Sequence, residues 1–336
     1  MHPDSWKACC RLGASCGRDY LWTQGGGGNV SCIDASGGAS VLRIKRSGLR
    51  LRDLAAPEDL VPLPLGAVRD LFYSAAATGA PDADERLEGL APAGFGAPSV
   101  EAFFHAMLGP FTAHAHLVSA TAVATLDGDP SPRIAVARRL GSVLGAFCEW
   151  VPYAPPGSAL AREVHARLPS PTPTRGVLLL QNHGAIVWGP TPEDVHTRFD
   201  RLDAVCRWEL GAQGAPGPAA ALVAGDFDPD GTPLFGDLRP GDLTALRAPW
   251  TPDGALHFGH GLEPPFGALP ALGRLFLRDG ALRYACARPE LLGNALEIMN
   301  AQLTAQRWTR GFQALLAPGQ VDALLRWGAG KYGIGR

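Results

Sequence analysis

The pattern of hydrophobic and polar positions predicts helices and strands that alternate along the chain. Residues 5–18 are predicted to form an opening helix, and LWTQGGGGNVSCI is predicted to lead through a Gly-rich turn into a strand. The segment ASVLRIKRSG indicates a second strand that ends at the turn Ser47-Gly48. Residues 80–98 are rich in Ala, Pro, Gly and Asp, so we expect an irregular loop there.

The middle of the chain continues this pattern with clearer boundaries. Ser99 is expected to cap a helix that carries Glu101 and His105 four residues apart on one face. RGVLLLQNHGAIVWG is predicted to form two short strands that break at residues 182–184, because a continuous helix would not hold Asn-His-Gly. After Gly189, TPEDVHTRFDRLDAVCRWEL begins with a Thr-x-x-Asp capping signal and is predicted to be an amphipathic helix.

A segment with the composition of a linker follows the predicted amphipathic helix and separates the N-terminal part of the chain from the C-terminal part. The run GAQGAPGPAAALVAGDFDPDGTP is rich in Gly, Ala and Pro, and it places a domain boundary between about residues 212 and 245. We expect one domain over residues 1–225 and a C-terminal extension over residues 226–336. In the extension, strands and turns precede helices at 289–304 and 318–328.

Composition and charge exclude several classes of partner. The chain has 336 residues, 46% of them hydrophobic, and its net charge of -2 gives no reason to expect nucleic acid or an anionic membrane as a partner. It has no run of 18 apolar residues, and no signal-peptide core stands near its start, so we expect a cytoplasmic protein. Seven cysteines without a CxxC pair fit reduced, buried thiols better than disulfides or a zinc ribbon.

The apolar run FTAHAHLVSATAV contains two histidines at an unusual spacing. Residues i and i+2 of a strand face the same side, so His114 and His116 would project together and could share a cation. Alternatively, both are partly buried and hydrogen-bonded to backbone. His183 stands between an apolar strand and a glycine, and three imidazoles with an open fourth position are typical of a catalytic zinc site. Glu101 precedes the His-x-His strand and offers a carboxylate for proton transfer.

The segments GGGGNVS, KRSG, PSVEAFFH, HAH and LLLQNHGAIVWG, in this order, resemble the class II aldolase/adducin family over roughly residues 5–210. The resemblance implies a three-layer α/β/α fold with a central, mostly antiparallel sheet, here followed by a small, mainly helical C-terminal extension. VPYAPPG and WGAGKY look most like the aldolase half of proteins that fuse a rhamnulose-1-phosphate-type aldolase to a short-chain dehydrogenase. The dehydrogenase half is absent from this sequence.

The resemblance also implies roles for individual residues. It makes Glu101 the acid/base beside a zinc ion whose ligands are His114, His116 and His183. In the family, a phosphate group of the substrate is held by residues that correspond here to Asn29, Ser47, Gly48 and Ser99. Glycines let backbone N–H groups approach an anion, and short polar side chains complete its hydrogen bonds.

Two features depart from the family's pattern. Val100 stands where the simplest fuculose-type aldolases have a second Ser, and Lys45 or Arg46 would either replace that donor or face solvent. The tyrosine acid that a neighbouring subunit supplies in the family cannot be assigned among the five tyrosines. His105 would either lie behind the metal ligands or pack on its helix, and we favour packing.

The implied function is a zinc-dependent aldolase that cleaves a ketose 1-phosphate to dihydroxyacetone phosphate and an aldehyde. The same metal site would also serve a sugar-phosphate epimerase or dehydratase. A different class of protein, the adducin-like interaction module, keeps the fold without the chemistry, and the presence of all three histidines and Glu101 argues against it. Because family members are commonly tetramers, the resemblance implies a homo-oligomer, with a tetramer favoured.

Overall fold

A computed structural model gives the structure of the protein and divides it into two compact units, Met1–Ala124 with Asp129–Cys206, and Thr125–Gly128 with Arg207–Arg336. The predicted boundary at residues 225–226 lies outside the residues that the structure describes. These are residues 5–35, 38–78, 82–126, 128–129, 131–211, 223–224, 232–235, 246–259, 261–263, 273–278, 281–285, 291–309 and 314–332.

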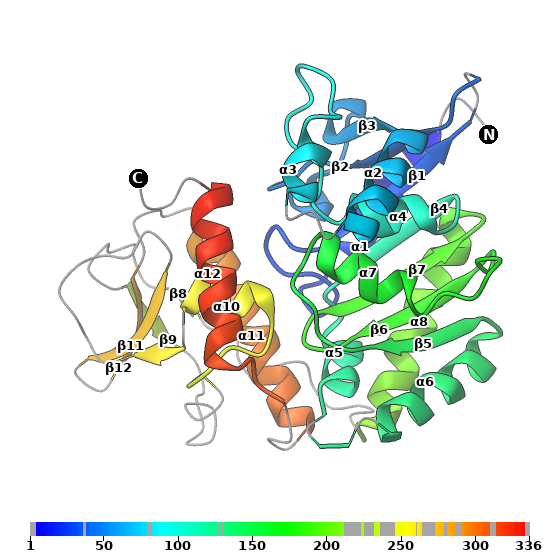
Figure 1. Cartoon of the computed structure of the whole chain (residues 1–336). Helices are drawn as coiled ribbons and strands as arrows, with labels where there is room; N and C mark the ends of the chain where they lie inside the picture. Colours follow the sequence, from blue (N-terminus) through cyan, green and yellow to red (C-terminus); the bar gives the residue numbers. More distant parts are fainter. Residues whose placement is uncertain are drawn as a thin grey trace. The chain divides into compact units, whose positions relative to one another are not determined.

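The first unit is built on a seven-stranded sheet with the order β3-β2-β1-β4-β7-β6-β5 (Figure 1). Neighbouring strands are antiparallel except for the parallel pair β5–β6, so the predicted mostly antiparallel sheet is confirmed. The strands are β1 Asn29–Asp34, β2 Val41–Lys45, β3 Leu60–Pro64, β4 Phe111–Ala115, β5 Phe147–Val151, β6 Gly176–Leu180 and β7 Gly184–Gly189.

Helices cover both faces of this sheet and complete the three layers. On one face, α2, α3, α4 and α7 share an apolar core with strand residues such as Ile186 and Trp188. On the other face, α1 packs on β1, α5 on β6 and β7, and α6 on β5. The helices of this unit are α1 Ser5–Cys16, α2 Leu65–Thr78, α3 Ala83–Glu88, α4 Ala102–Met107, α5 Val118–Ala124, α6 Ser131–Leu144, α7 Ser158–His165 and α8 Pro192–Glu209, with short 3₁₀ turns η1 Leu51–Asp53 and η2 Pro57–Asp59.

Two predictions for this unit were wrong. The segment predicted to be a loop contains α3, because Ala83 and Leu87 lie one turn apart and both are buried in the core. Ser99 does not cap α4, since the residue at the N-cap position is Glu101. The Ser99 hydroxyl instead accepts a hydrogen bond from the Glu101 backbone N–H at 3.4 Å, so Ser99 shapes the turn that precedes the helix.

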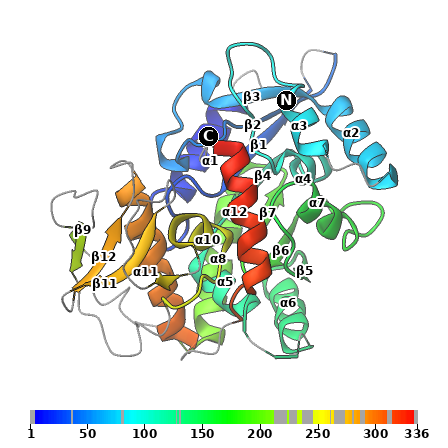
Figure 2. The same ribbon diagram turned by 60° about the vertical axis from the view of Figure 1, so that its left-hand side comes forward.

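The second unit contains a smaller sheet with the order β10-β11-β12-β9-β8, whose only parallel pair among the described strands is β10–β11. Its strands are β8 Val223–Ala224, β9 Thr232–Phe235, β10 Leu262–Glu263, β11 Arg274–Arg278 and β12 Ala281–Ala285. Side chains of β11, β12 and α11 share one apolar core, and Figure 2 shows α11 beside these strands. The helices are α10 Pro252–Phe258, α11 Leu291–Thr309 and α12 Pro318–Tyr332.

The two long helices of this unit confirm those predicted at 289–304 and 318–328, whereas α10 was not predicted. Its start signal is nevertheless present in the sequence. The Thr251 hydroxyl accepts a hydrogen bond from the Gly254 N–H at 3.2 Å, and Pro252 occupies the first helical turn. Within the described residues, no helix is both long enough and apolar enough to cross a bilayer.

Candidate metal centre

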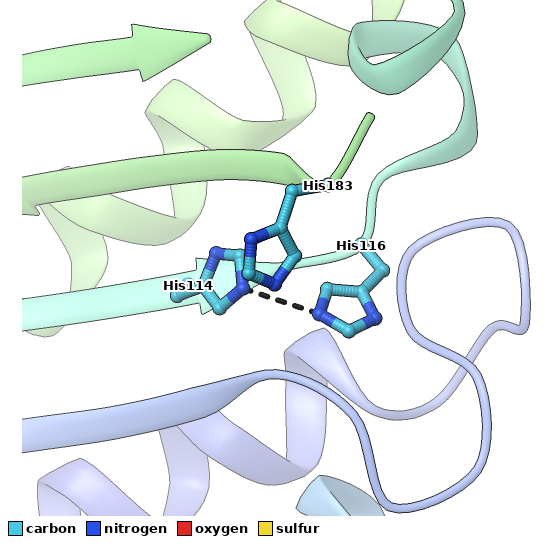
Figure 3. Close-up of side chains that lie close together, drawn as sticks. All are labelled: His114, His116 and His183. Carbon is cyan, nitrogen blue, oxygen red and sulfur yellow. Dashed lines mark hydrogen bonds between the residues drawn. The ribbon is translucent and has the colours of Figure 1, made fainter. Parts of the chain in front are cut away.

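Three buried imidazoles meet at one end of β4 (Figure 3). His114 lies on β4, His116 follows directly after its last residue, and His183 lies in the turn between β6 and β7. One ligand nitrogen from each ring lies within 4.8 Å of the others, and the Nε2 atoms of His114 and His116 are 3.2 Å apart. The structure therefore brings together all three histidines that the sequence predicted to be metal ligands.

Local backbone geometry brings His183 to the His-x-His strand. Asn182 adopts a positive φ of 57°, so the chain reverses sharply between the two apolar strands. Gly184 then passes so close to β4 that a Cβ atom would lie only 2.3 Å from the Ala115 carbonyl oxygen. The Asn-His-Gly sequence thus provides both the turn and the close approach that place His183 opposite His116.

Glu101, the residue directly before α4, adds a carboxylate to the cluster. One carboxylate oxygen lies 3.6 Å from His114 Nε2 and the other lies 3.6 Å from His183 Nε2. Burial by itself raises the pKa of Glu101, but the facing His114 and His183 and a hydrogen bond from Asn29 lower the pKa to about 2. The carboxylate is therefore ionised at neutral pH.

The arrangement fits a tetrahedral divalent metal ion. His114 Nδ1 donates to the Ala185 carbonyl oxygen at 3.0 Å, which directs the Nε2 lone pair into the cluster. Two ligands of a tetrahedral zinc ion, each bonded at about 2.0–2.1 Å, lie about 3.3 Å apart, close to the 3.2 Å between the Nε2 atoms of His114 and His116 and the 3.6 Å between Glu101 and each of His114 and His183. Glu101 Oε1 is also buried and accepts no hydrogen bond from the described residues. Imidazole suits zinc, but it also suits cobalt, nickel, copper and iron.

Asn29 and Ser99, two of the residues expected to hold phosphate, lie beside Glu101. The Asn29 amide nitrogen donates to Glu101 Oε2 at 2.6 Å and to the Ser99 hydroxyl at 3.0 Å. Both N–H groups of this amide are thus engaged, and Asn29 links the candidate phosphate residues to the acid/base. The pairing of Asn29 with His114 in neighbouring strands explains why this side chain reaches the cluster.

Ser47 and Gly48 form a turn, and the buried side chain of Lys45 links this turn to the Gly-rich loop. Lys45 Nζ donates to the Gly26 carbonyl at 3.0 Å and to the Leu49 carbonyl at 2.6 Å. Gly48 has a positive φ of 83°, and a Cβ there would meet no atom within 4 Å. Lys45 is only 2% exposed, whereas the Arg46 side chain is 38% exposed and lies 4.0 Å from Asp59. Of the two neighbouring cations, Lys45 is the one that fastens the loops.

Two further residues support the cluster: Gln24, which the sequence reasoning missed, and His105, for which both alternatives named from the sequence hold. Gln24 Nε2 donates to the backbone carbonyl of His116 at 3.2 Å, and nothing in the sequence indicated this contact. His105 was expected to pack, and it does stack on Phe104 at 4.7 Å between ring centroids. It also hydrogen-bonds to Ser31 and Asn29, which its spacing of four residues from Glu101 could have indicated.

Comparisons with known proteins agree with the fold of the first unit. The family described as Class II Aldolase and Adducin N-terminal domain matches residues 8–210. A search of curated proteins found no match. The N-terminal class II aldolase domain of a Thermoplasma acidophilum protein is 22% identical, with a TM-score of 0.50 over 62% of this chain and 95% of that chain.

Two further solved structures show lower TM-scores. YgbL from Klebsiella pneumoniae, a putative aldolase/epimerase/decarboxylase, is 22% identical with a TM-score of 0.46, over 63% of this chain and 90% of that chain. An L-fuculose-1-phosphate aldolase from Thermus thermophilus is 19% identical with a TM-score of 0.41, over 63% of this chain and 98% of that chain. The family match spans more than half of the chain and contains every residue of the histidine cluster, so this protein belongs to the class II aldolase and adducin family.

Proposed function

We propose that the protein is a zinc-dependent aldolase that cleaves a ketose 1-phosphate to dihydroxyacetone phosphate and an aldehyde. The observation that supports this most is the Glu101 carboxylate, buried between two of three clustered imidazoles. An interaction module would not need a buried carboxylate and three imidazoles in this arrangement, because burying such groups without a ligand costs free energy.

The chemistry needs a Lewis acid and a group that moves a proton. A divalent metal held by His114, His116 and His183 would supply polarisation of the substrate's carbonyl and hydroxyl oxygens. Cleavage of the C3–C4 bond requires a proton to leave the C4 hydroxyl, whose oxygen becomes that of the aldehyde, and a proton to be added at C3. Glu101 is ionised and adjoins the imidazoles that would hold the metal, so its carboxylate would accept the proton from the C4 hydroxyl and, once protonated, would deliver it to C3.

The phosphate end of the substrate would bind near Ser99 and the Ser47-Gly48 turn, beside Asn29, whose two N–H groups already donate to Glu101 and Ser99. The Gly-rich loop and this turn carry backbone N–H groups, and both are fastened by the Lys45 ammonium group. A fixed grip on the phosphate would hold the reacting carbons at the metal, and such positioning can lower a barrier by as much as about 7–11 kcal/mol.

An epimerase or a dehydratase would use the same histidines and carboxylate. The reaction type is therefore distinguished by identifying the products. Release of free dihydroxyacetone phosphate indicates cleavage, whereas an isomer of unchanged mass indicates epimerisation. The motifs VPYAPPG and WGAGKY support a rhamnulose-type ketose as the first substrate to test. Zinc as the metal, a homo-tetramer and a cytoplasmic location stay predictions from the sequence and the family.

The proposal is tested with a panel of ketose 1-phosphates, assayed for dihydroxyacetone phosphate, on wild type and on Glu101→Gln. Loss of a positioned acid/base typically slows a reaction about 10²–10⁴-fold, so we expect Glu101→Gln to lower kcat at least about 100-fold. Glu88→Gln changes an exposed carboxylate at the end of α3 in the same way and should leave kcat unchanged. Cleavage by Glu101→Gln as fast as by wild type would exclude the role given to Glu101.

A further inference from the structure

A buried chain of hydrogen bonds runs from β1 through α4 to the candidate metal centre. The Ser31 hydroxyl lies 2.7 Å from His105 Nδ1, and His105 Nε2 is hydrogen-bonded to Asn29 Oδ1. The Asn29 amide nitrogen then donates to Glu101 Oε2 at 2.6 Å. None of these four residues is more than 5% exposed, so water does not compete for their hydrogen bonds.

The orientation of the Asn29 amide sets the direction of every bond in this chain. Its NH₂ group donates to Glu101 Oε2 and to the Ser99 hydroxyl, so its carbonyl oxygen faces His105 and accepts from it. His105 must then carry its proton on Nε2, and Nδ1 must accept from the Ser31 hydroxyl. Burial lowers the pKa of His105 to about 3, which agrees with the neutral ring that this pattern requires.

The backbone explains why these four residues meet. Ser31 and Asn29 are two residues apart on β1 and therefore project from the same face of the sheet. Glu101 stands at the N-cap of α4 and His105 lies one turn further on, so the two side chains face this strand together. The chain of bonds thus ties the start of a short helix to the strand beneath it.

We propose that His105 is a positioning residue: it fixes the orientation of the Asn29 amide, and through that amide it holds the Glu101 carboxylate against the metal-binding imidazoles. This inference rests on the proposed function for the role of Glu101, but the orientation of the bonds is a property of the protein alone. The competing view is that His105 only fills space beside Phe104, on which it stacks.

Two substitutions at one position separate these views. His105→Gln keeps an N–H donor at about the place of Nε2, so it preserves the bond to Asn29. His105→Phe keeps a flat ring of similar size for packing on Phe104 but removes both hydrogen bonds. Ser31→Ala removes only the outer bond and leaves the ring in place, which makes it a milder probe of the same chain.

The first experiment is ¹⁵N NMR of the metal-free full chain labelled at histidine, at neutral pH. The His105 signals are assigned by their absence from His105→Gln. We expect a neutral ring protonated at Nε2. A ring protonated at Nδ1, or a charged imidazolium, would reverse the direction of the bonds and overturn the proposal. This result does not depend on any enzymatic activity, so it stands even if no sugar phosphate is cleaved.

The second experiment uses Co²⁺ as the probe, because its visible absorption reports the ligands around it. We expect His105→Phe to shift the Co²⁺ spectrum in the same direction as Glu101→Gln, and His105→Gln to retain the wild-type spectrum. Adding His105→Phe to Glu101→Gln should cause no further change, since the effect passes through Glu101. The proposal would be overturned if the Co²⁺ spectrum of His105→Phe equalled that of wild type. It would also be overturned if His105→Phe shifted the spectrum of the Glu101→Gln variant as much as it shifts that of wild type.

Kinetics give a matching readout once a substrate is known. Groups that orient metal-site side chains typically contribute about 10–100-fold, so His105→Phe should lower kcat by that factor while KM stays unchanged. His105→Gln should recover most of the rate. Recovery by Gln separates positioning from packing, because Gln lacks the ring that stacks on Phe104.

Discussion

Gly184 is the residue on which the geometry of the histidine cluster depends most directly. A Cβ at this position would lie 2.3 Å from the Ala115 carbonyl and 3.0 Å from the His116 Cα, both of which are backbone atoms that cannot move aside. Gly184→Ala should therefore push the His183 turn away from His116. We expect zinc affinity to fall at least about 10-fold, since the ligands no longer converge.

Competition titration with a chromogenic zinc chelator measures this loss. Gly66→Ala is the control, because a Cβ at Gly66 in α2 meets no atom within 4 Å. That change should leave zinc affinity unaltered and alter stability by no more than about 1 kcal/mol. Zinc binding by Gly184→Ala that equals wild type would mean that the close approach of the two strands does not set the site.

At this scale, the sequence identified the histidines and Glu101 but not the partners that orient them. The i, i+2 spacing of His114 and His116 and the glycine after His183 are local signals that left a structural role open, and the resemblance to the family supplied the ligand set and the role of Glu101. The bond of Asn29 to Glu101 joins residues 72 positions apart, and that of Gln24 to His116 joins residues 92 apart. Such contacts depend on how strands and helices pack, so no local pattern reveals them.

At the scale of elements, the buried Lys45 at the end of β2 joins two loops. Its hydrogen bonds to the Gly26 and Leu49 carbonyls tie the Gly-rich loop to the Ser47-Gly48 turn. Lys45→Met keeps the length of the side chain but leaves both carbonyls without these donors. We expect a loss of about 1–3 kcal/mol in the free energy of unfolding, and a higher KM for a phosphorylated substrate.

Urea denaturation and steady-state kinetics measure these two effects. Arg46→Met removes the adjacent cation, which is partly exposed and lies 4.0 Å from Asp59. Ion pairs of this kind contribute little, so this control should change stability by less than about 1 kcal/mol. If Lys45→Met were as stable as Arg46→Met and bound substrate equally well, the two loops would not depend on the ammonium group.

The elements that the sequence predicted best are those with strong local signals. β6 and β7 were predicted from two apolar runs separated by Asn-His-Gly, and α8 from its Thr191 cap, whose hydroxyl accepts from the Asp194 N–H at 3.1 Å. α3 was missed because Pro and Gly dominate the flanking sequence, while burial of Ala83 and Leu87 stabilises it. Tertiary packing thus overrode the local composition.

At the scale of the whole molecule, the order of the motifs predicted the architecture of the first unit better than that of the second. The five sequence motifs that resemble the family are spread over the first unit, and together they predicted one sheet between two helical layers. The residues of the histidine cluster come from different motifs of this series. The second unit has strands as short as Val223–Ala224 and Leu262–Glu263. Strands of this length carry too little alternation to be predicted.

The central claim is that this chain holds a metal ion between His114, His116 and His183. Mass spectrometry of the purified protein measures metal content per chain directly, beside the double variant His114→Ala, His183→Ala. We expect about one zinc per chain in wild type and none in the variant, because three protein ligands are typical of a catalytic zinc site. Wild-type protein that contains no metal, even after incubation with zinc, would contradict the aldolase mechanism and favour an interaction module on the same fold.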